Sequence, residues 1–156
     1  SGWSVRPRGH KLLIVGDLGS VPRRWAGRLR GAAADEVVFA GSEYDPDRLD
    51  TLRRGALFHL HGHQVGGTNP SLLEAMAVGN AVVAHNNTFN RQVAGDGALY
   101  FNNTADCDEA ITVLLNDQDM RSSMGQANHE AAHERFSDQA CFEAWSSLLA
   151  GGRADD

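Results

Sequence analysis

The chain reads ALFHLHGHQVGGTNPSLLEAMAVGNAVVAH from Ala56 to His85, and this stretch decides the fold class. A β-type run over 56–61 ends at Gly62, and an aliphatic run over 80–85 follows Gly79. Between them, residues 69–78 begin with an Asn at the helix cap and a Pro in the first turn, and a glycine follows the last turn. A strand, a helix and a strand in this order predict a right-handed crossover between two parallel strands.

The rest of the chain continues this alternation of short strands and helices. The pattern predicts strands over 11–15, 36–40 and 97–101, helices over 22–34 and 46–54, a helical turn over 89–94, and helices over 106–115, 120–135 and 137–149. The strand runs are aliphatic rather than alternating, which is typical of strands buried on both faces. The sequence therefore predicts an α/β fold, a Rossmann-like parallel sheet with helices on both faces.

Parallel sheets of this kind bind ligands at the carboxyl ends of their strands, so we expect the site in the loops at 16–21, 41–45, 62–69 and 86–89. In the third of these loops Gly66 and Gly67 precede the capped helix, where the first-turn amides of Ser71 and Leu72 would form an anion site.

Glu74 lies one turn deeper on the same helix, among apolar neighbours, so we expect its carboxylate to be largely buried. A buried carboxylate needs hydrogen-bond donors, which the hydroxyls of a ribose would supply. The alternative is that Asn69 and Pro70 only cap a core helix, and that Glu74 pairs with an arginine.

Composition limits the function classes. The 156 residues carry a net charge of −6, which disfavours general nucleic-acid binding, and no apolar run is long enough to cross a membrane. The absence of a signal-peptide pattern predicts a cytoplasmic protein. Cys107 and Cys141 are expected to be buried free thiols. We expect a linker or truncated domain start over 1–10, one domain over 11–150 and a disordered tail over 151–156.

Two histidine patterns compete with this interpretation. His129-Glu130-Ala131-Ala132-His133 matches the zinc-hydrolase pattern H-E-x-x-H, but no convincing third ligand follows and the charged surroundings favour a surface helix. His59, His61 and His63 alternate, so a strand would place all three on one face, as a metal site, as ligand contacts or in packing. We favour ligand contact or packing, and we expect no metal and no cofactor.

The segment Glu74-Ala75-Met76-Ala77-Val78-Gly79, followed by the strand Ala81-Val82-Val83-Ala84, resembles the donor-binding signature of the family 4 glycosyltransferases of GT-B fold. The resemblance covers roughly residues 11–149 and implies the C-terminal half of such an enzyme. Gly66 stands where many members have a first glutamate. The family's Gly-Arg…Lys-Gly segment is also absent, and Lys11 is the only lysine.

The resemblance implies a retaining transferase that moves a sugar from a nucleoside diphosphate to a glycan or lipid-linked acceptor. The subgroup that it resembles is associated with bacterial surface polysaccharides, and a position at the inner face of the membrane is compatible with it. An N-terminal domain would supply the acceptor site and any general base, so the domain by itself would be inactive. The rival from another class is a non-catalytic module that binds a nucleotide or a sugar phosphate.

The resemblance also implies roles for individual residues, and it leaves the catalytic residues unidentified. The residues that would bind the donor are Gly66, Gly67, Thr68, Asn69, Pro70, Ser71 and Leu72 at the pyrophosphate and sugar, Glu74 at the ribose, Gly41 and Ser42 at the base, Gly16 and Asp17 beside the cleft, and His61 or His63 at the donor.

Overall fold

The computed structural model describes residues 3–65 and 67–151. In chain order the elements are η1 (Trp3–Val5), β1 (Leu12–Val15), α1 (Arg23–Gly31), β2 (Val37–Gly41), α2 (Pro46–Arg54), β3 (His59–His61), α3 (Pro70–Ala77), β4 (Val82–His85), α4 (Thr88–Ala94), β5 (Ala98–Phe101), α5 (Thr104–Asn116), α6 (Gln118–Phe136) and α7 (Asp138–Gly151). The predicted order of strands and helices is confirmed, and most of the tail predicted over 151–156 lies outside the described residues.

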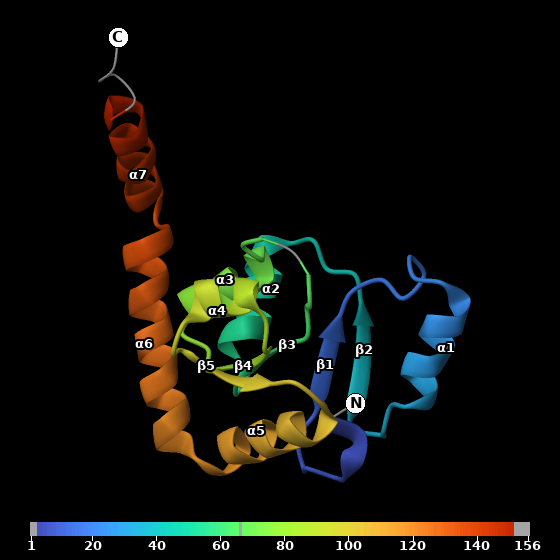
Figure 1. The fold of residues 1–156 in the computed structure, drawn as a ribbon. Helices are drawn as coiled ribbons and strands as arrows, with labels where there is room; N and C mark the ends of the chain where they lie inside the picture. Colours follow the sequence, from blue (N-terminus) through green and yellow to red (C-terminus); the bar gives the residue numbers. More distant parts are fainter. Residues whose placement is uncertain (1–2, 66, 152–156) are drawn as a thin grey trace.

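All described strand pairs are parallel, which confirms the α/β class. The strands form two hydrogen-bonded sheets rather than one: β1 pairs with β2, and β3, β4 and β5 form the second sheet in that order. Figure 1 shows the β1–β2 pair beside β3, with α1 at its outer side. The expected single sheet is therefore interrupted, because no described strand lies between β1 and β3.

The core lies on both faces of β4. Val82 and Ala84 on one face pack with side chains of α3, α4 and α6, such as Leu72 and Met76. Ala81 and Val83 face α5, and Figure 1 shows α5 on the side of this sheet opposite to α3 and α4. Burial on both faces is thus confirmed for β4.

The same expectation is wrong for β1 and β2, where Leu13, Val15 and Val38 are each about 40% exposed (41%, 38% and 40%). The two strands carry aliphatic runs, but side chains on one face of their sheet are only partly covered by other parts of the chain.

The end of α3 and the middle of α6 approach each other through two glycines. An ideal Cβ on Gly125 would lie 2.2 Å from the carbonyl oxygen of Gly79, which itself has a φ of +83°. Three residues further along α6, Asn128 is buried and its Nδ2 donates to the carbonyl oxygens of Asn80 (2.9 Å) and Gly97 (2.8 Å). These contacts hold α6 on the turns that precede β4 and β5.

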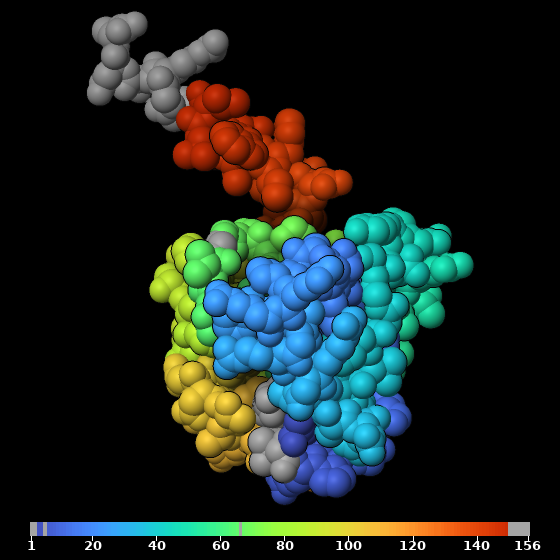
Figure 2. All heavy atoms as spheres, turned by 90° about the vertical axis from the view of Figure 1, so that its right-hand side faces the viewer, coloured from blue at the N-terminus to red at the C-terminus, as the bar shows by residue number. Residues whose placement is uncertain are grey.

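α7 extends beyond the body of the domain, as Figures 1 and 2 show. Its apolar side chains are largely exposed: Phe142, Trp145, Leu148 and Leu149. Cys107 on α5 is buried, but Cys141 on α7 is exposed, so the prediction of two buried thiols is wrong for Cys141. The apolar periodicity of α7 predicted burial, but its helix contacts little except α6. Over the described residues, no helix combines the length and the apolar character that a membrane crossing needs.

At the opposite end of the chain, residues 3–8 pack onto α5. Trp3 is 3% exposed within a cluster that contains Ile111, and Arg8 pairs with Asp108 at 2.5 Å. The division of the chain at residues 10 and 150 stays a prediction.

Two histidines of β3 lie under α3. His59 is in register with Val82 and His61 with Ala84, so both point to the face that α3 covers. Burial lowers the pKa of His59 to about 4, with smaller contributions from His61, Arg53 and His63. Burial and the adjacent His63 lower the pKa of His61 to about 4. Both imidazoles are therefore neutral in the folded protein at pH 7.

Replacing Gly125 with alanine tests the close contact of α6 with Gly79. Alanine normally stabilises a helix by up to about 1 kcal/mol relative to glycine. Here the new Cβ would overlap backbone, and overpacking of this kind costs about 1–3 kcal/mol. We expect chemical denaturation to show a lower free energy of unfolding for Gly125→Ala. The control is Gly27→Ala on exposed α1, where an added Cβ meets nothing within 4 Å and the free energy of unfolding should rise. Equal effects of the two changes would contradict the contact.

The buried histidines predict an acid-sensitive stability. The folded pKa of each lies below the ordinary value of 6.5, so the unfolded chain binds more protons between pH 6.5 and pH 4. The free energy of unfolding should therefore be nearly independent of these groups above pH 6.5. It should fall by about 5 kcal/mol as the pH decreases from 6.5 to 4, with similar contributions from the two histidines.

Urea denaturation at several pH values measures this slope. The double variant His59→Gln/His61→Gln should flatten it, whatever its stability at pH 7, whereas His133→Gln on the exposed side of α6 should not. A slope that the double variant leaves unchanged would show that other groups cause it.

Candidate functional site

A cleft of about 1690 Å³ lies between the two sheets, and residues at the carboxyl ends of β1, β2 and β3 form part of its lining. It brings together six of the predicted site residues, from the loops after β1, β2 and β3 and from the start of α3. They are Gly16, Asp17, Ser42, His61, His63 and Ser71. Glu43 and Tyr44 also line it, and hydrogen bonds from the amides of Asp45 and Tyr44 keep the pKa of Glu43 below its ordinary value. Loops at the sheet edge predicted from the strand order thus form part of the lining of this cleft.

The loops after β1 and β2 are joined directly. The amide of Gly16 donates to the carbonyl oxygen of Gly41 at 2.8 Å. Gly41 has a φ of +77°, a backbone conformation that residues other than glycine rarely adopt. This glycine pair fixes where Asp17 and Ser42 enter the cleft.

The loop after β3 is held in place by α4. The carbonyl oxygen of His63 accepts hydrogen bonds from Nδ2 of Asn87 (2.9 Å) and of Asn90 (3.0 Å). Nδ2 of Asn90 also donates to the carbonyl oxygen of His85 at 2.9 Å, and Asn90 is only 3% exposed. These two asparagines connect the carboxyl ends of β3 and β4, so they position His63 without entering the cleft.

Asn87 and Asn90 are positioning residues that were not predicted from the sequence. Asn87 caps α4, since its Oδ1 accepts from the amide of Asn90 at 2.9 Å. An Asn two residues before an apolar helical turn was the available signal. It could predict the cap but not the bond to His63, because that residue is 24 positions away.

The three alternating histidines do lie on one face. The ring centroids of His59 and His61 are 5.8 Å apart, and those of His61 and His63 are 4.8 Å apart and stacked. His61 is 2% exposed and its Nε2 has no partner among the described residues, while His63 is exposed. His63 is thus the member of this row that is accessible to a ligand.

The first turn of α3 differs from the prediction. Oδ1 of Asn69 accepts from the amide of Ser71 at 3.2 Å, and the carbonyl oxygen of Asn69 accepts from the amide of Leu72 at 3.1 Å. The two amides expected to bind an anion are therefore already bonded, because Asn69 caps its own helix. The side chain of Leu72 is completely buried in the core. In the loop before the helix, Gly67 and Thr68 are exposed. Their amides have no hydrogen-bond acceptor among the described residues.

Glu74 also differs from the prediction, because its side chain is 53% exposed rather than buried. Its Oε2 accepts a hydrogen bond from Nη2 of Arg53 at 2.5 Å. The alternative pairing with an arginine is thus confirmed. The apolar neighbours of Glu74 face the core, whereas Glu74 lies on the side of α3 that meets α2.

Arg53 is a third residue whose importance the sequence did not indicate. Its side chain is 17% exposed, and the residue lines the cleft. Its carbonyl oxygen accepts from Nδ2 of Asn80 at 2.9 Å, which joins the end of α2 to the turn before β4. Among the described residues that line the cleft, Arg53 and Lys11 carry the fixed positive charges.

The other predicted site residues that the structure describes do not line this cleft. Gly66 lies outside the described residues. The others are at the strand end of β2 or around the start of α3: Gly41, Gly67, Thr68, Asn69, Pro70, Leu72 and Glu74. Their roles toward a ligand stay predictions.

The zinc pattern on α6 has a structural explanation. Nδ1 of His129 lies 2.6 Å from the carbonyl oxygen of Ala77, and the rings of His129 and His133 meet edge to face at 4.4 Å. Over residues 3–65 and 67–151, no group of three or more His, Cys, Asp or Glu side chains is arranged to hold a metal ion. His129 therefore serves to attach α6 to the end of α3.

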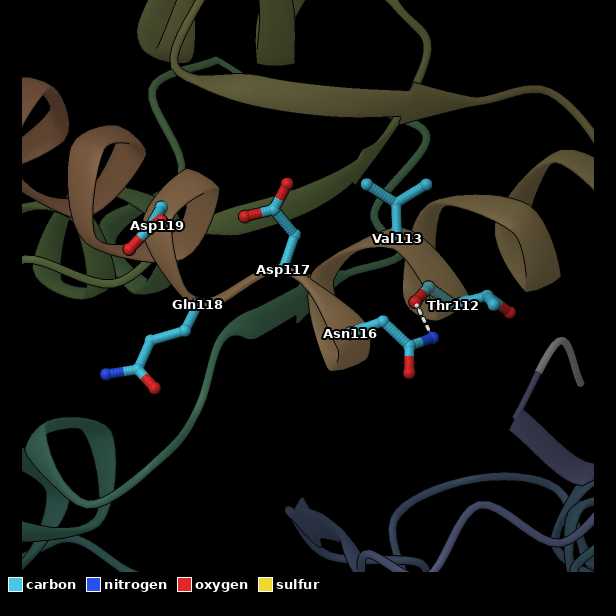
Figure 3. A pocket seen from close by; sticks show the side chains of 6 residues that line it. All are labelled: Thr112, Val113, Asn116, Asp117, Gln118 and Asp119. Carbon is cyan, nitrogen blue, oxygen red and sulfur yellow. Dashed lines mark hydrogen bonds between the residues drawn. The ribbon is translucent and has the colours of Figure 1, made fainter.

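A second hollow, of about 890 Å³, lies at the turn between α5 and α6. Its lining side chains include Asn116, Asp117 and Gln118, and Figure 3 shows the last two pointing away from each other. Nδ2 of Asn116 is bonded to the carbonyl oxygen of Thr112 at 2.8 Å. This hollow offers no converging polar groups, so the cleft at the strand ends is the candidate site.

Comparison with known proteins supports the fold. The crystal structure of Anabaena HepE in complex with UDP-glucose matches with a TM-score of 0.78 and 16% sequence identity, over 96% of this chain and 43% of that chain. The chain thus spans less than half the length of HepE, and the similarity identifies the Rossmann-like fold of GT-B glycosyltransferases. No curated protein is significantly similar in sequence to the chain.

A comparison with protein-family profiles identifies the family as well as the fold. The profile of the family described as "Glycosyl transferases group 1" matches residues 9–131, which is most of the chain. The matched segment contains the five strands that the structure describes and the helices α1 to α5. This chain therefore belongs to the group 1 glycosyltransferase family.

Proposed function

We propose that this chain is the donor-binding domain of a retaining glycosyltransferase. It would bind a nucleoside diphosphate sugar and present the sugar to a glycan or lipid-linked acceptor, in the synthesis of a bacterial polysaccharide. The observation that carries the proposal is the cleft at the carboxyl ends of the strands in a chain of this family. HepE, which has the same fold, was crystallised with UDP-glucose, so UDP-glucose is the first donor to test.

The loop between β3 and α3 would receive the negatively charged part of the donor. The amides of Gly67 and Thr68 are available as hydrogen-bond donors, and the dipole of α3 places partial positive charge at the same end. His63 projects into the cleft beside this loop. Amides and a fixed cation such as Arg53 would stabilise the negative charge that develops as the nucleoside diphosphate leaves. The proposal therefore requires no bound metal.

Glu74 would bind the ribose with the oxygen that Arg53 leaves free. Arg53 donates to Oε2, so the guanidinium fixes the orientation of the carboxylate. Since the Glu74 side chain is half exposed, Oε1 can accept from a hydroxyl group without displacing Arg53. The pairing found in the structure is thus compatible with the role that the resemblance implies.

The acceptor and the general base belong to another part of the enzyme in this proposal. The chain corresponds to 43% of HepE, which leaves more than half of that protein without a counterpart here. We expect the purified chain to bind the donor without transferring the sugar, and transfer by the chain alone would contradict this division.

Replacing Glu74 with glutamine tests the site. Isothermal titration calorimetry should detect UDP-glucose binding to the chain. Glu74→Gln keeps the shape of the side chain but removes a charged hydrogen-bond acceptor, which should weaken binding by about 1–3 kcal/mol. GDP and dTDP as competitors would show which base the cleft prefers.

The matched control is Glu130→Gln on the exposed side of α6, which should leave the affinity unchanged. Circular dichroism should show that both variants fold. If none of UDP-glucose, GDP and dTDP binds to the chain, the donor-binding function is contradicted. Equal affinities of the wild-type chain and Glu74→Gln would limit Glu74 to its pairing with Arg53.

A further inference from the structure

Positive charge is concentrated on α1. The helix contains no carboxylate and a set of arginines: Arg23, Arg24, Arg28 and Arg30. Across the wider segment 18–34 there is also no Asp or Glu, although the chain as a whole has a net charge of −6. The rest of the chain is therefore more acidic than the whole, and α1 stands out as a local basic surface. Local charge of this kind determines which partners a surface attracts.

The guanidinium groups of α1 are unpaired within the described part of the chain. None of them makes an ion pair or a hydrogen bond with another described side chain or carbonyl oxygen. Every other arginine that the structure describes is bonded to a side chain or to a main-chain carbonyl oxygen: Arg6, Arg8, Arg48, Arg53, Arg54, Arg91, Arg121 and Arg135. The four arginines of α1 are exposed, so their charges are accessible to a partner outside the domain.

An aromatic ring lies among these arginines. Trp25 is 46% exposed, and the Cζ atoms of Arg24 and Arg28 lie over its ring, 5.8 Å and 4.9 Å from the centroid. Leu29, one turn further along, lines the cleft, whereas Trp25 does not. An indole ring surrounded by long basic side chains is typical of helices that lie in the headgroup region of a bilayer.

The side of α1 that carries these residues is open. Figure 1 shows α1 beyond β2, at the side of the domain opposite to α6. In Figure 2, which views the domain from that side, α1 lies at the front in blue and α7 points away from it. At Gly27 and Gly31 an added Cβ would meet nothing within 4 Å. A flat surface can therefore approach along the length of the helix.

We propose that α1 docks the domain on the surface of an anionic lipid bilayer. The docking surface consists of Arg23, Arg24, Trp25, Arg28 and Arg30. The guanidinium groups bind lipid phosphates, and the ring of Trp25 enters the headgroup region. The inference goes beyond the proposed function and does not depend on it, because none of these five residues lines the donor cleft.

The combination of charge and an exposed ring favours a bilayer over a nucleic acid. Nucleic-acid binding draws mainly on charge, and the acidic remainder of the chain would repel a polyanion that extends beyond α1. A bilayer contacts only the outer side of the helix and also accommodates the apolar part of Trp25.

Docking through α1 would bring one wall of the cleft close to the lipid surface. α1 follows β1 after the loop 16–22, in which Gly16, Asp17 and Ser20 line the cleft. The first turn of α1, with Arg23 and Arg24, therefore lies at the carboxyl edge of β1.

Co-sedimentation with lipid vesicles tests the proposal. The chain is mixed with vesicles of phosphatidylcholine that contain about 30% phosphatidylglycerol, and with vesicles of phosphatidylcholine alone, at about 0.1 M salt. We expect binding to the anionic vesicles only, and its loss at about 1 M salt. Because each arginine near an anionic leaflet strengthens binding about fivefold, Arg24→Gln/Arg28→Gln should weaken it about thirtyfold.

The matched control is Arg48→Gln/Arg54→Gln on α2. It removes the same charge from two exposed arginines that are paired with Glu43 and Asp50, so vesicle binding should be nearly unchanged. Circular dichroism during thermal unfolding should show that both double variants fold.

Several outcomes would overturn the proposal. Equal binding to neutral and anionic vesicles, or binding that Arg24→Gln/Arg28→Gln leaves unchanged, would assign it to other residues, such as the exposed apolar side chains of α7. An equal loss in the α2 control would show that only total charge matters. Failure to bind anionic vesicles, or binding of an oligouridylate in their place, would exclude the bilayer as the partner of α1. UDP-glucose is absent from these samples, so a failure here is distinguishable from a failure of donor binding.

Discussion

The common direction of the strands is the constraint on which the candidate site depends. Because the strand pairs within each sheet are parallel, the loops that follow β1 and β2 leave one sheet at a common edge, and those that follow β3 and β4 leave the other in the same way. Residues that are far apart in the sequence, such as Asp17, Ser42 and His63, therefore line one cleft. Hydrogen bonds between neighbouring loops then fix their positions, from Gly16 to Gly41 and from Asn87 and Asn90 to His63.

The contacts that stabilise the fold and the loops that line the candidate site lie at opposite ends of the strands. β4 and the helices packed on it supply the buried core, and the contact of Gly125 with Gly79 and the two bonds of Asn128 hold α6 at the amino ends of β4 and β5. The carboxyl ends carry exposed loops with glycines and polar side chains. Such loops can differ in sequence between members of a family without disturbing the core, which is compatible with the proposed recognition of a particular donor.

Local signals in the sequence were sufficient for the helices and strands. α2 lies over the predicted range 46–54, and α3 begins after Asn69 and ends before Gly79, as the predicted cap and the glycine indicate. Contacts between distant residues could not be predicted in this way. The pairing of Glu74 with Arg53 depends on how α2 and α3 pack against each other. The amides of Ser71 and Leu72 are unavailable to a ligand because they donate hydrogen bonds to Asn69, and this depends on the conformation of Asn69. The hydrophobic pattern also could not predict that β1 and β3 lie in separate sheets. The aliphatic run of β1 has the same composition whether or not another strand pairs with its second edge.

The most direct test of the donor-binding cleft is an NMR titration of the chain with UDP-glucose, which maps the ligand without any substitution. We expect the shifted amides to cluster around Gly16, Ser42, His63, Gly67 and Thr68, and the turn between α5 and α6 to stay unchanged. Shifts confined to that turn, or a spectrum that saturating UDP-glucose leaves unchanged, would contradict it.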